Sequence, residues 1–156
     1  MTPGAPEAAF SVRRDDLEVT TAPDRIDVGV VHGFLTASYW ATGIPRELVE
    51  RALAHSLNFG LYRAGAQIGL ARFVTDYATF AWLADVFVLE PHRRQGLATW
   101  LVGTALTHPV LTGLRRLLLV TRDQQALYGR LGFAPLAHPE RFMEVNRLNL
   151  YQRAGG

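Results

Sequence analysis

Apolar side chains recur with helical spacing in the first third of the chain. Within residues 26–40 they occupy positions 30, 31, 34 and 35, and Asp24 or Asp27 can cap the start of a helix. A second apolar stripe at positions 48, 49, 52 and 53 follows Pro45, a residue suited to a first helical position. The pattern therefore predicts two helices, the first ending near residue 40.

Aromatic and branched side chains indicate strands around and beyond these helices. Residues 17–21 alternate between apolar and polar, which is typical of a first strand. The ranges 59–63, 67–75 and 79–89 are separated by short turn segments and predict an antiparallel three-strand meander. The middle of the chain is therefore expected to be sheet.

The second half predicts further helices and strands. A helix is expected from about residue 96 to 108, where Pro109 ends or kinks it. Residues 116–121 form a short buried strand, and Asp123 can cap a last helix that Gly132 closes. Residues 133–136 and 143–148 also look like strands.

The 156 residues are 49% hydrophobic, which suits one domain with a core of ordinary size. We expect a flexible tail over residues 1–15, one domain over 16–150 and a C-terminal tail over 151–156. No stretch is apolar enough to span a membrane, and no secretory signal is evident at the N-terminus. We therefore expect a cytoplasmic protein without membrane partners.

The composition disfavours several functions. The chain has no cysteine, and all sixteen of its basic residues are arginine, which excludes thiolate and Schiff-base lysine chemistry. No two of its five histidines lie three or four positions apart, so no metal site is predicted. The net charge is only +2 and the arginine pairs are scattered, which argues against a nucleic-acid partner.

The strongest local signal is the apolar run at 86–89, which breaks into a basic turn that opens a helix. Backbone N–H groups at a helix start have no intrahelical acceptor and can bind phosphate. Gly96 leaves room for a diphosphate near the backbone, and the small Ala98 keeps the first helical turn open. Arg93 and Arg94 add positive charge, although an exposed basic turn without a ligand is the alternative.

This turn, Arg93-Arg94-Gln95-Gly96-Leu97-Ala98, is followed after a short strand by Leu127-Tyr128 and Gly132-Phe133. The two motifs in this order resemble the GNAT superfamily of N-acetyltransferases, and the resemblance covers roughly residues 17 to 150. It implies an α/β (α+β) single-domain fold. That fold has a mixed central sheet of about six to seven strands, antiparallel in its first half, flanked by about four helices.

The resemblance also implies acetyl-CoA as a cosubstrate, held by the central strand, the basic turn and the start of the next helix. Thr121 stands where many members have an asparagine, and its hydroxyl can replace only part of the hydrogen bonding of an amide. The residues expected to bind it are Val86, Phe87, Val88, Arg93, Arg94, Gln95, Gly96, Leu97, Ala98, Thr99 and Thr121.

Tyr128 falls on the position that donates a proton to the departing thiolate in this family, and core packing is its alternative role. Asp85 is the nearest candidate for the base. Asp76 and Asp123 are alternatives with simpler roles in a turn and a helix cap, and ordered water is another route.

Tyr39 and Trp40 lie where the family builds its acceptor pocket and could form an aromatic wall, or they could pack in the interior. We therefore expect an acetyl-CoA-dependent N-acetyltransferase for a primary amine of a small molecule, amino acid derivative or peptide. A CoA-binding sensor without turnover is the alternative. A homodimer is possible, and the sequence does not identify the acceptor.

Overall fold

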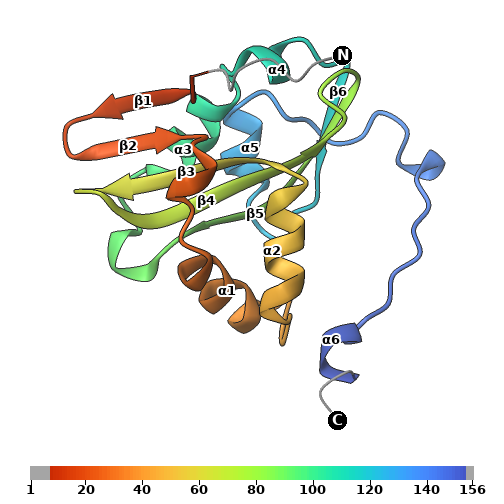
Figure 1. Ribbon diagram of the computed structural model, residues 1–156. Helices are drawn as coiled ribbons and strands as arrows, with labels where there is room; N and C mark the ends of the chain where they lie inside the picture. Colours follow the sequence, from red (N-terminus) through yellow and green to blue (C-terminus); the bar gives the residue numbers. More distant parts are fainter. Residues whose placement is uncertain (1–7, 154–156) are drawn as a thin grey trace, which may run out of the picture.

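The computed structural model describes residues 8–153 and arranges their strands in one mixed sheet (Figure 1). Neighbouring strands are antiparallel from β1 to β5, whereas β5 and β6 run parallel. This confirms the predicted fold class and the antiparallel meander. In sheet order the strands are β1 (Ser11–Arg14), β2 (Leu17–Thr20), β3 (Leu57–Arg63), β4 (Ala66–Thr75), β5 (Phe80–Val88) and β6 (Arg116–Leu119).

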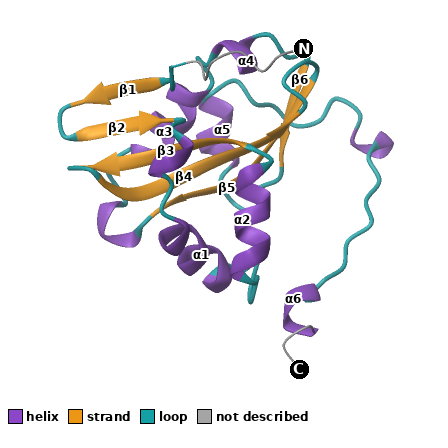
Figure 2. Ribbon diagram, in the orientation of Figure 1, coloured by secondary structure: helices purple, strands orange, loops and turns teal. Residues whose placement is uncertain are grey.

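Helices cover both faces of this sheet (Figure 2). At the start of the first helix, which begins at Val28, the Asp27 side chain accepts a hydrogen bond from the Val30 amide at 3.1 Å. None of the helices among the described residues is long and apolar enough to cross a membrane. The helices are α1 (Val28–Ala37), α2 (Arg46–Ala54), α3 (Leu97–Ala105), α4 (Pro109–Thr112), α5 (Gln125–Arg130) and α6 (Leu150–Arg153).

Two apolar cores hold these layers together. On the α3 face the sheet contributes Phe59 and Phe73, which pack with Leu101. On the other face α1 and α2 pack over Leu70 and Phe87. Burying each such side chain stabilises the fold by roughly 1.5–3 kcal/mol. Because β5 contributes side chains to both cores, it is held from both faces.

The ring of Phe87 stacks on Phe34 of α1, with the ring centroids 4.1 Å apart. Its neighbours Val86 and Val88 belong to the core on the α3 face. A strand with apolar side chains on both faces is typical of the centre of a sheet. The backbone of β5 is therefore held firmly in place around residues 86–88.

The structure differs from the sequence pattern at several positions. The pattern did not predict β1. This strand lies inside the segment interpreted as a tail and pairs with β2. The predicted cap at Asp123 is wrong, because the Thr121 hydroxyl accepts the Gln124 amide at 3.0 Å and α5 has no side-chain cap. Helix α3 ends at Ala105, before the expected end near residue 108, and Pro109 begins the separate short helix α4. Residues 1–7 of the expected tail lie outside the described residues.

The two last predicted strands are also wrong. Residues 133–136 and 143–148 are not part of the sheet, and no backbone hydrogen bond joins 143–148 to other described residues. Residues 134–149, which we call the C-terminal arm, leave the body and run to α6 (Figure 1). An alternating pattern predicts an extended backbone but does not determine whether a partner strand is available.

Candidate active site

The parallel strands β5 and β6 separate halfway along β5. Their pairing runs from Phe80 opposite Arg116 to Leu83 opposite Leu119 and ends there, while β5 continues to Val88. Beyond Leu83 the side of β5 that faces β6 therefore has no partner strand among the described residues. Its backbone groups can pair with an extended ligand arm, as an added strand would.

A bulge lies in this unpaired part of β5. Along β4 the register passes from Leu70 to Arg72, while along β5 it passes from Phe87 to Ala84, so β5 carries one extra residue. Asp85 lies within the bulge and has a positive φ of 50°, which is uncommon for a residue with a side chain. The bulge redirects the backbone beside the gap between the strands.

The basic turn leads from the end of β5 into α3. Gly96 caps the helix in the left-handed conformation with φ 72°, and a Cβ placed there would meet nothing within 4 Å. Within residues 8–153 the amides of Leu97, Ala98 and Thr99 have no acceptor, and no side chain caps this helix. Three outward N–H groups and the helix dipole therefore form a seat for an anion.

Two side chains of the turn brace it against the body. The Arg93 Nε donates a hydrogen bond to the Val88 carbonyl at 2.8 Å, and Gln95 Oε1 accepts one from Arg63 at 2.9 Å. The Arg94 side chain has no ion-pair partner among the residues described, and its φ is 64°. Arg94 is therefore the arginine of the turn that remains available for a ligand.

Tyr128, on α5, is half-buried and packs against the core on the α3 face of the sheet. Its ring packs edge-on against Phe133 with the centroids 5.9 Å apart. Burial raises the pKa of the Tyr128 phenol, and the nearby Tyr39 hydroxyl raises it further. The phenol is therefore protonated at neutral pH and can act as a proton donor.

Tyr39 and Trp40 are 58% and 44% exposed, which rules out interior packing of both rings. They pack edge to face with centroids 5.0 Å apart, and the Arg122 guanidinium lies 4.0 Å above the Tyr39 ring. The loop after α1 and the loop after β6 thus approach each other at Tyr39, which is near enough to Tyr128 to affect the pKa of its phenol.

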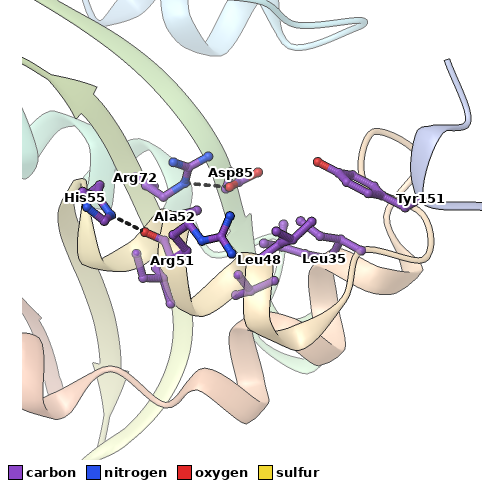
Figure 3. Close-up of a pocket in the computed structure, with 11 residues that line it drawn as sticks. Leu35, Leu48, Arg51, Ala52, His55, Arg72, Asp85 and Tyr151 are labelled. Atoms are coloured by element: carbon purple, nitrogen blue, oxygen red, sulfur yellow. Dashed lines mark hydrogen bonds and ion pairs between the residues drawn. The ribbon is translucent and has the colours of Figure 1, made fainter. Parts of the chain in front are cut away.

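Both carboxylate oxygens of Asp85 already accept hydrogen bonds. Arg72 Nε donates to Oδ2 at 2.8 Å, and Trp40 Nε1 donates to Oδ1 at 2.8 Å. Arg72 also donates to the Ser56 hydroxyl at 3.0 Å. Asp85 is therefore held in place at the bulge by Arg72 of β4, whose contact Figure 3 shows, and by Trp40 in the loop after α1.

A cavity of about 400 Å³ opens beside Asp85, between α2 and the sheet (Figure 3). Its lining is mostly apolar, with Arg51, His55 and Arg72 as further polar groups. Tyr39 and Trp40, expected at the acceptor pocket, do not line it. The lining residues are Leu35, Ile44, Leu48, Val49, Arg51, Ala52, Leu53, His55, Arg72, Asp85 and Tyr151.

Two of these polar groups can still form an ion pair or a hydrogen bond with a ligand. The Arg51 guanidinium has no ion-pair partner in the described part of the chain, whereas Arg46 on the same helix pairs with Glu50 at 3.1 Å. The His55 Nδ1–H donates to the Arg51 carbonyl at 2.9 Å, which leaves Nε2 as an acceptor when the ring is neutral. The cavity therefore offers a cation and a weak base near Asp85.

Sequence reasoning missed Arg51, His55, Arg72 and Tyr151. Arg51 and His55 lie on the polar side of a helical pattern, where solvated residues are the ordinary reading. Arg72 gave a usable signal, because it is a charge inside an apolar strand and such a charge requires a partner.

Of the other two acidic candidates, Asp76 has a structural role and Asp123 has none that the contacts show. Asp76 lies in the β4–β5 turn, where the Thr79 hydroxyl and the amides of Thr79, Ala78 and Phe80 hold its pKa well below the usual range. Asp123 accepts a single hydrogen bond within residues 8–153, from the neighbouring Gln124 side chain at 3.4 Å. Residues 8–153 contain no cluster of three or more His, Asp or Glu side chains able to hold a metal ion.

Known proteins share this fold and sequence pattern. The sequence pattern of the Acetyltransferase (GNAT) family matches residues 30–133. A proposed acetyltransferase of Gibberella zeae is 31% identical over 140 residues, which cover 75% of this chain and 78% of that protein. The chain belongs to the GNAT acetyltransferase family.

Solved structures agree with this assignment. A proposed GNAT-family acetyltransferase from Xanthomonas campestris pv. campestris is 44% identical, with a TM-score of 0.84 over 86% of this chain and 96% of that one. A protein from Clostridium acetobutylicum, solved with acetyl-CoA, is 14% identical and shares the fold, with a TM-score of 0.62 over 83% of this chain and 96% of that one.

Proposed function

We propose that the protein is an acetyl-CoA-dependent N-acetyltransferase that acts on a primary amine. One observation carries the proposal. The unpaired side of β5 is followed directly, through the basic turn, by the free amides at the start of α3. One suits an extended amide-bearing arm, and the other suits a diphosphate. Family membership and the Clostridium neighbour solved with acetyl-CoA support this reading.

Each part of the binding surface has a separate task. The amides of Leu97, Ala98 and Thr99, with the Arg94 side chain, hold the diphosphate. The backbone of Val86, Phe87 and Val88 pairs with the pantetheine arm. Bound there, acetyl-CoA supplies a thioester whose carbonyl oxygen meets a β5 N–H group, which stabilises the charge that develops during attack.

Tyr128 is proposed as the general acid. The acceptor nitrogen bonds to the acetyl carbon, the carbon–sulfur bond breaks, and the departing thiolate takes the phenol proton. The phenol recovers its proton from solvent. The raised pKa of Tyr128 supports this role because it keeps the acid form populated at neutral pH.

The acceptor must lose a proton before or during attack. For an alkylamine with a pKa near 10.4, deprotonation at pH 7 costs on the order of 4.6 kcal/mol. Asp85, at the bulge beside the reacting position, is proposed to bind the ammonium and take its proton, directly or through water. His55 Nε2 on the same cavity is the second candidate.

The cavity beside Asp85 is proposed as the acceptor site. Its apolar lining suits a small side chain, and the unpaired Arg51 favours an acceptor that also carries a carboxylate or another anionic group. Amino acid derivatives and peptide termini with an acidic group combine these features.

Thiol release measured over a panel of amines tests the proposal. Anionic amino acid derivatives, neutral amines and polyamines are compared at equal concentration, and acetyl-CoA binding is measured in parallel by thermal shift. Thiol release that requires the amine supports the enzyme. Thermal stabilisation by acetyl-CoA without thiol release on any amine would favour the CoA-binding sensor. No stabilisation by acetyl-CoA would exclude both the enzyme and the sensor.

A further inference from the structure

An arginine of the sheet holds the basic turn at two points. Arg63 is the last residue of β3, and its guanidinium uses a different nitrogen for each contact. Nη1 donates to His92 Nδ1 at 2.7 Å, and Nη2 donates to Gln95 Oε1 at 2.9 Å. A guanidinium can only donate, so the histidine nitrogen is the acceptor in the first of these bonds. Arg63 therefore joins the end of β3 to two positions of the turn that lie three residues apart.

The other hydrogen bonds of the turn are local. The Arg93 amide donates to the Glu90 carbonyl at 3.1 Å, and the Arg93 Nε donates to the Val88 carbonyl at 2.8 Å. Within the described part of the chain, Arg63 is the residue of another strand or helix whose side chain forms hydrogen bonds with residues 90–96. Its contacts therefore relate the turn to the rest of the sheet.

The backbone of the turn requires such support. Arg94 and Gly96 both adopt the left-handed conformation, with φ values of 64° and 72°, and Gln95 lies between them. The left-handed conformation is unfavourable for a residue with a side chain, and it persists where surrounding contacts maintain it. The hydrogen bond from Arg63 to the Gln95 side chain is such a contact.

The β1–β2 turn fixes the third nitrogen of the same guanidinium. Asp16 Oδ2 lies 3.5 Å from Arg63 Nε, and the Asp16 carbonyl accepts a hydrogen bond from the Ala64 amide at 2.9 Å. The guanidinium is planar and rigid, so partners on all three nitrogens determine its orientation. Arg63 therefore holds the basic turn from a fixed position.

We propose that Arg63 is a positioning residue for acetyl-CoA binding, which acts through Gln95 and His92 on the turn that leads to the free amides at the start of α3. This inference rests on the proposed function of those amides. All three nitrogens of Arg63 are already engaged by the chain, so Arg63 needs no contact with the cosubstrate. Without it, the amides are still present but the turn is less ordered, and binding must then order it.

Arg63→Met tests this role, because it removes the donors and keeps an unbranched side chain. We expect Kd and KM for acetyl-CoA to rise about tenfold, the effect of losing a hydrogen bond from a charged group. Turnover at saturating acetyl-CoA should stay unchanged, because Tyr128 and Asp85 keep their contacts. Arg63→Lys supplies a single cationic group in place of the planar fork, so it should restore part of the lost affinity.

Arg25→Met is the matched control. Arg25 donates to Glu18 at 2.7 Å and lies 4.4 Å above the ring of Tyr62, which precedes Arg63 on β3. Its loss should lower Tm and leave KM for acetyl-CoA unchanged. An equal rise of KM in Arg25→Met and Arg63→Met would reduce the effect to general destabilisation and overturn the proposal.

A double variant tests whether Arg63 acts through the turn. Gln95→Ala is combined with Arg63→Met, and Kd for acetyl-CoA is measured for both single variants and the pair. If Arg63 acts through Gln95, the double variant binds no more weakly than Arg63→Met alone. Effects that multiply would show that the two residues act separately, and they would overturn the proposal.

Hydrogen exchange of the free protein distinguishes this inference from the proposed function. The Arg93 amide is hydrogen-bonded to Glu90, so its exchange rate reports the order of the turn without a ligand. We expect this rate to rise about tenfold in Arg63→Met, again the effect of one lost hydrogen bond, and to stay unchanged in Arg25→Met. Wild-type protein that does not bind acetyl-CoA would overturn the proposed function. Unchanged exchange or unchanged affinity in Arg63→Met, with binding by the wild type intact, would overturn the role of Arg63 alone.

Discussion

Trp40 and Asp85, 45 positions apart in the chain, are joined by a 2.8 Å hydrogen bond from the indole Nε1 to the carboxylate. This bond joins the loop after α1 to the bulge of β5, while Arg72 of β4 holds the other carboxylate oxygen. The orientation of the acidic group at the proposed site therefore depends on residues from three separate elements.

Trp40→Phe tests that dependence. The phenylalanine retains an aromatic ring but removes the donor, so Asp85 loses one of its two fixed contacts. We expect KM for the amine to rise about tenfold, the value of one lost hydrogen bond to a charged group, while KM for acetyl-CoA stays constant. Trp82→Phe, at a partly exposed position on β5, is the control and should leave both constants unchanged.

Tyr128→Phe tests the acid. Acetyl-CoA binding should persist and turnover should fall by about 10²–10⁴-fold, the usual contribution of a positioned acid. Because the pKa of Tyr128 is raised above 10.0, the wild-type phenol stays protonated up to that pH and loses its proton only beyond it. The ratio of wild-type to variant turnover should therefore be constant from pH 7 to pH 10.0 and fall above that pH. Equal turnover for the two proteins would remove Tyr128 from the mechanism.

Asp85→Asn and His55→Gln separate the two candidate bases. The proton acceptor sets the acidic limb of the pH–rate profile, because the group must be deprotonated to work. If Asp85 is the base, its variant loses that limb while His55→Gln keeps it. An intact limb in Asp85→Asn would exclude Asp85 as the base and leave it a role in binding the acceptor.

Arg51→Gln tests the preference for anionic acceptors. Removing the unpaired guanidinium should raise KM for an amine that carries a carboxylate by roughly 10–100-fold, since charge-assisted hydrogen bonds contribute about 1.5–3 kcal/mol. KM for a neutral amine of similar size should not change. Arg46→Gln, five residues earlier on α2 and paired with Glu50, serves as the control. A similar rise for both amines would indicate a general loss of cavity shape.

Gly96→Ala tests the turn at the start of α3. The left-handed φ of 72° makes an alanine there about 1–2 kcal/mol less stable, although the new methyl group meets no protein atom. The methyl group also enters the space proposed for the diphosphate, so KM for acetyl-CoA should rise. Gly33→Ala in the interior of α1 has open space and is expected to stabilise the protein by about 0.5–1 kcal/mol, with no change in KM.

The order of the elements and the family could be predicted from local sequence patterns. Helical stripes, the alternation of the meander and the turn at Gly96 are set by residues close together in the chain, so periodicity and backbone preference reveal them directly. The amides of Leu97, Ala98 and Thr99 were expected to lack acceptors for the same local reason, and in the described part of the chain they have none.

The cavity and the fate of the last segment were decided by tertiary structure alone. Arg72 and Asp85 come within 2.8 Å because β4 and β5 pair with a one-residue bulge, and no local pattern reports that register. Residues 143–148 have the alternation of a strand, but a strand needs a partner whose position depends on the whole sheet. Local sequence sets the backbone preference of each segment, whereas long-range packing determines which segments meet.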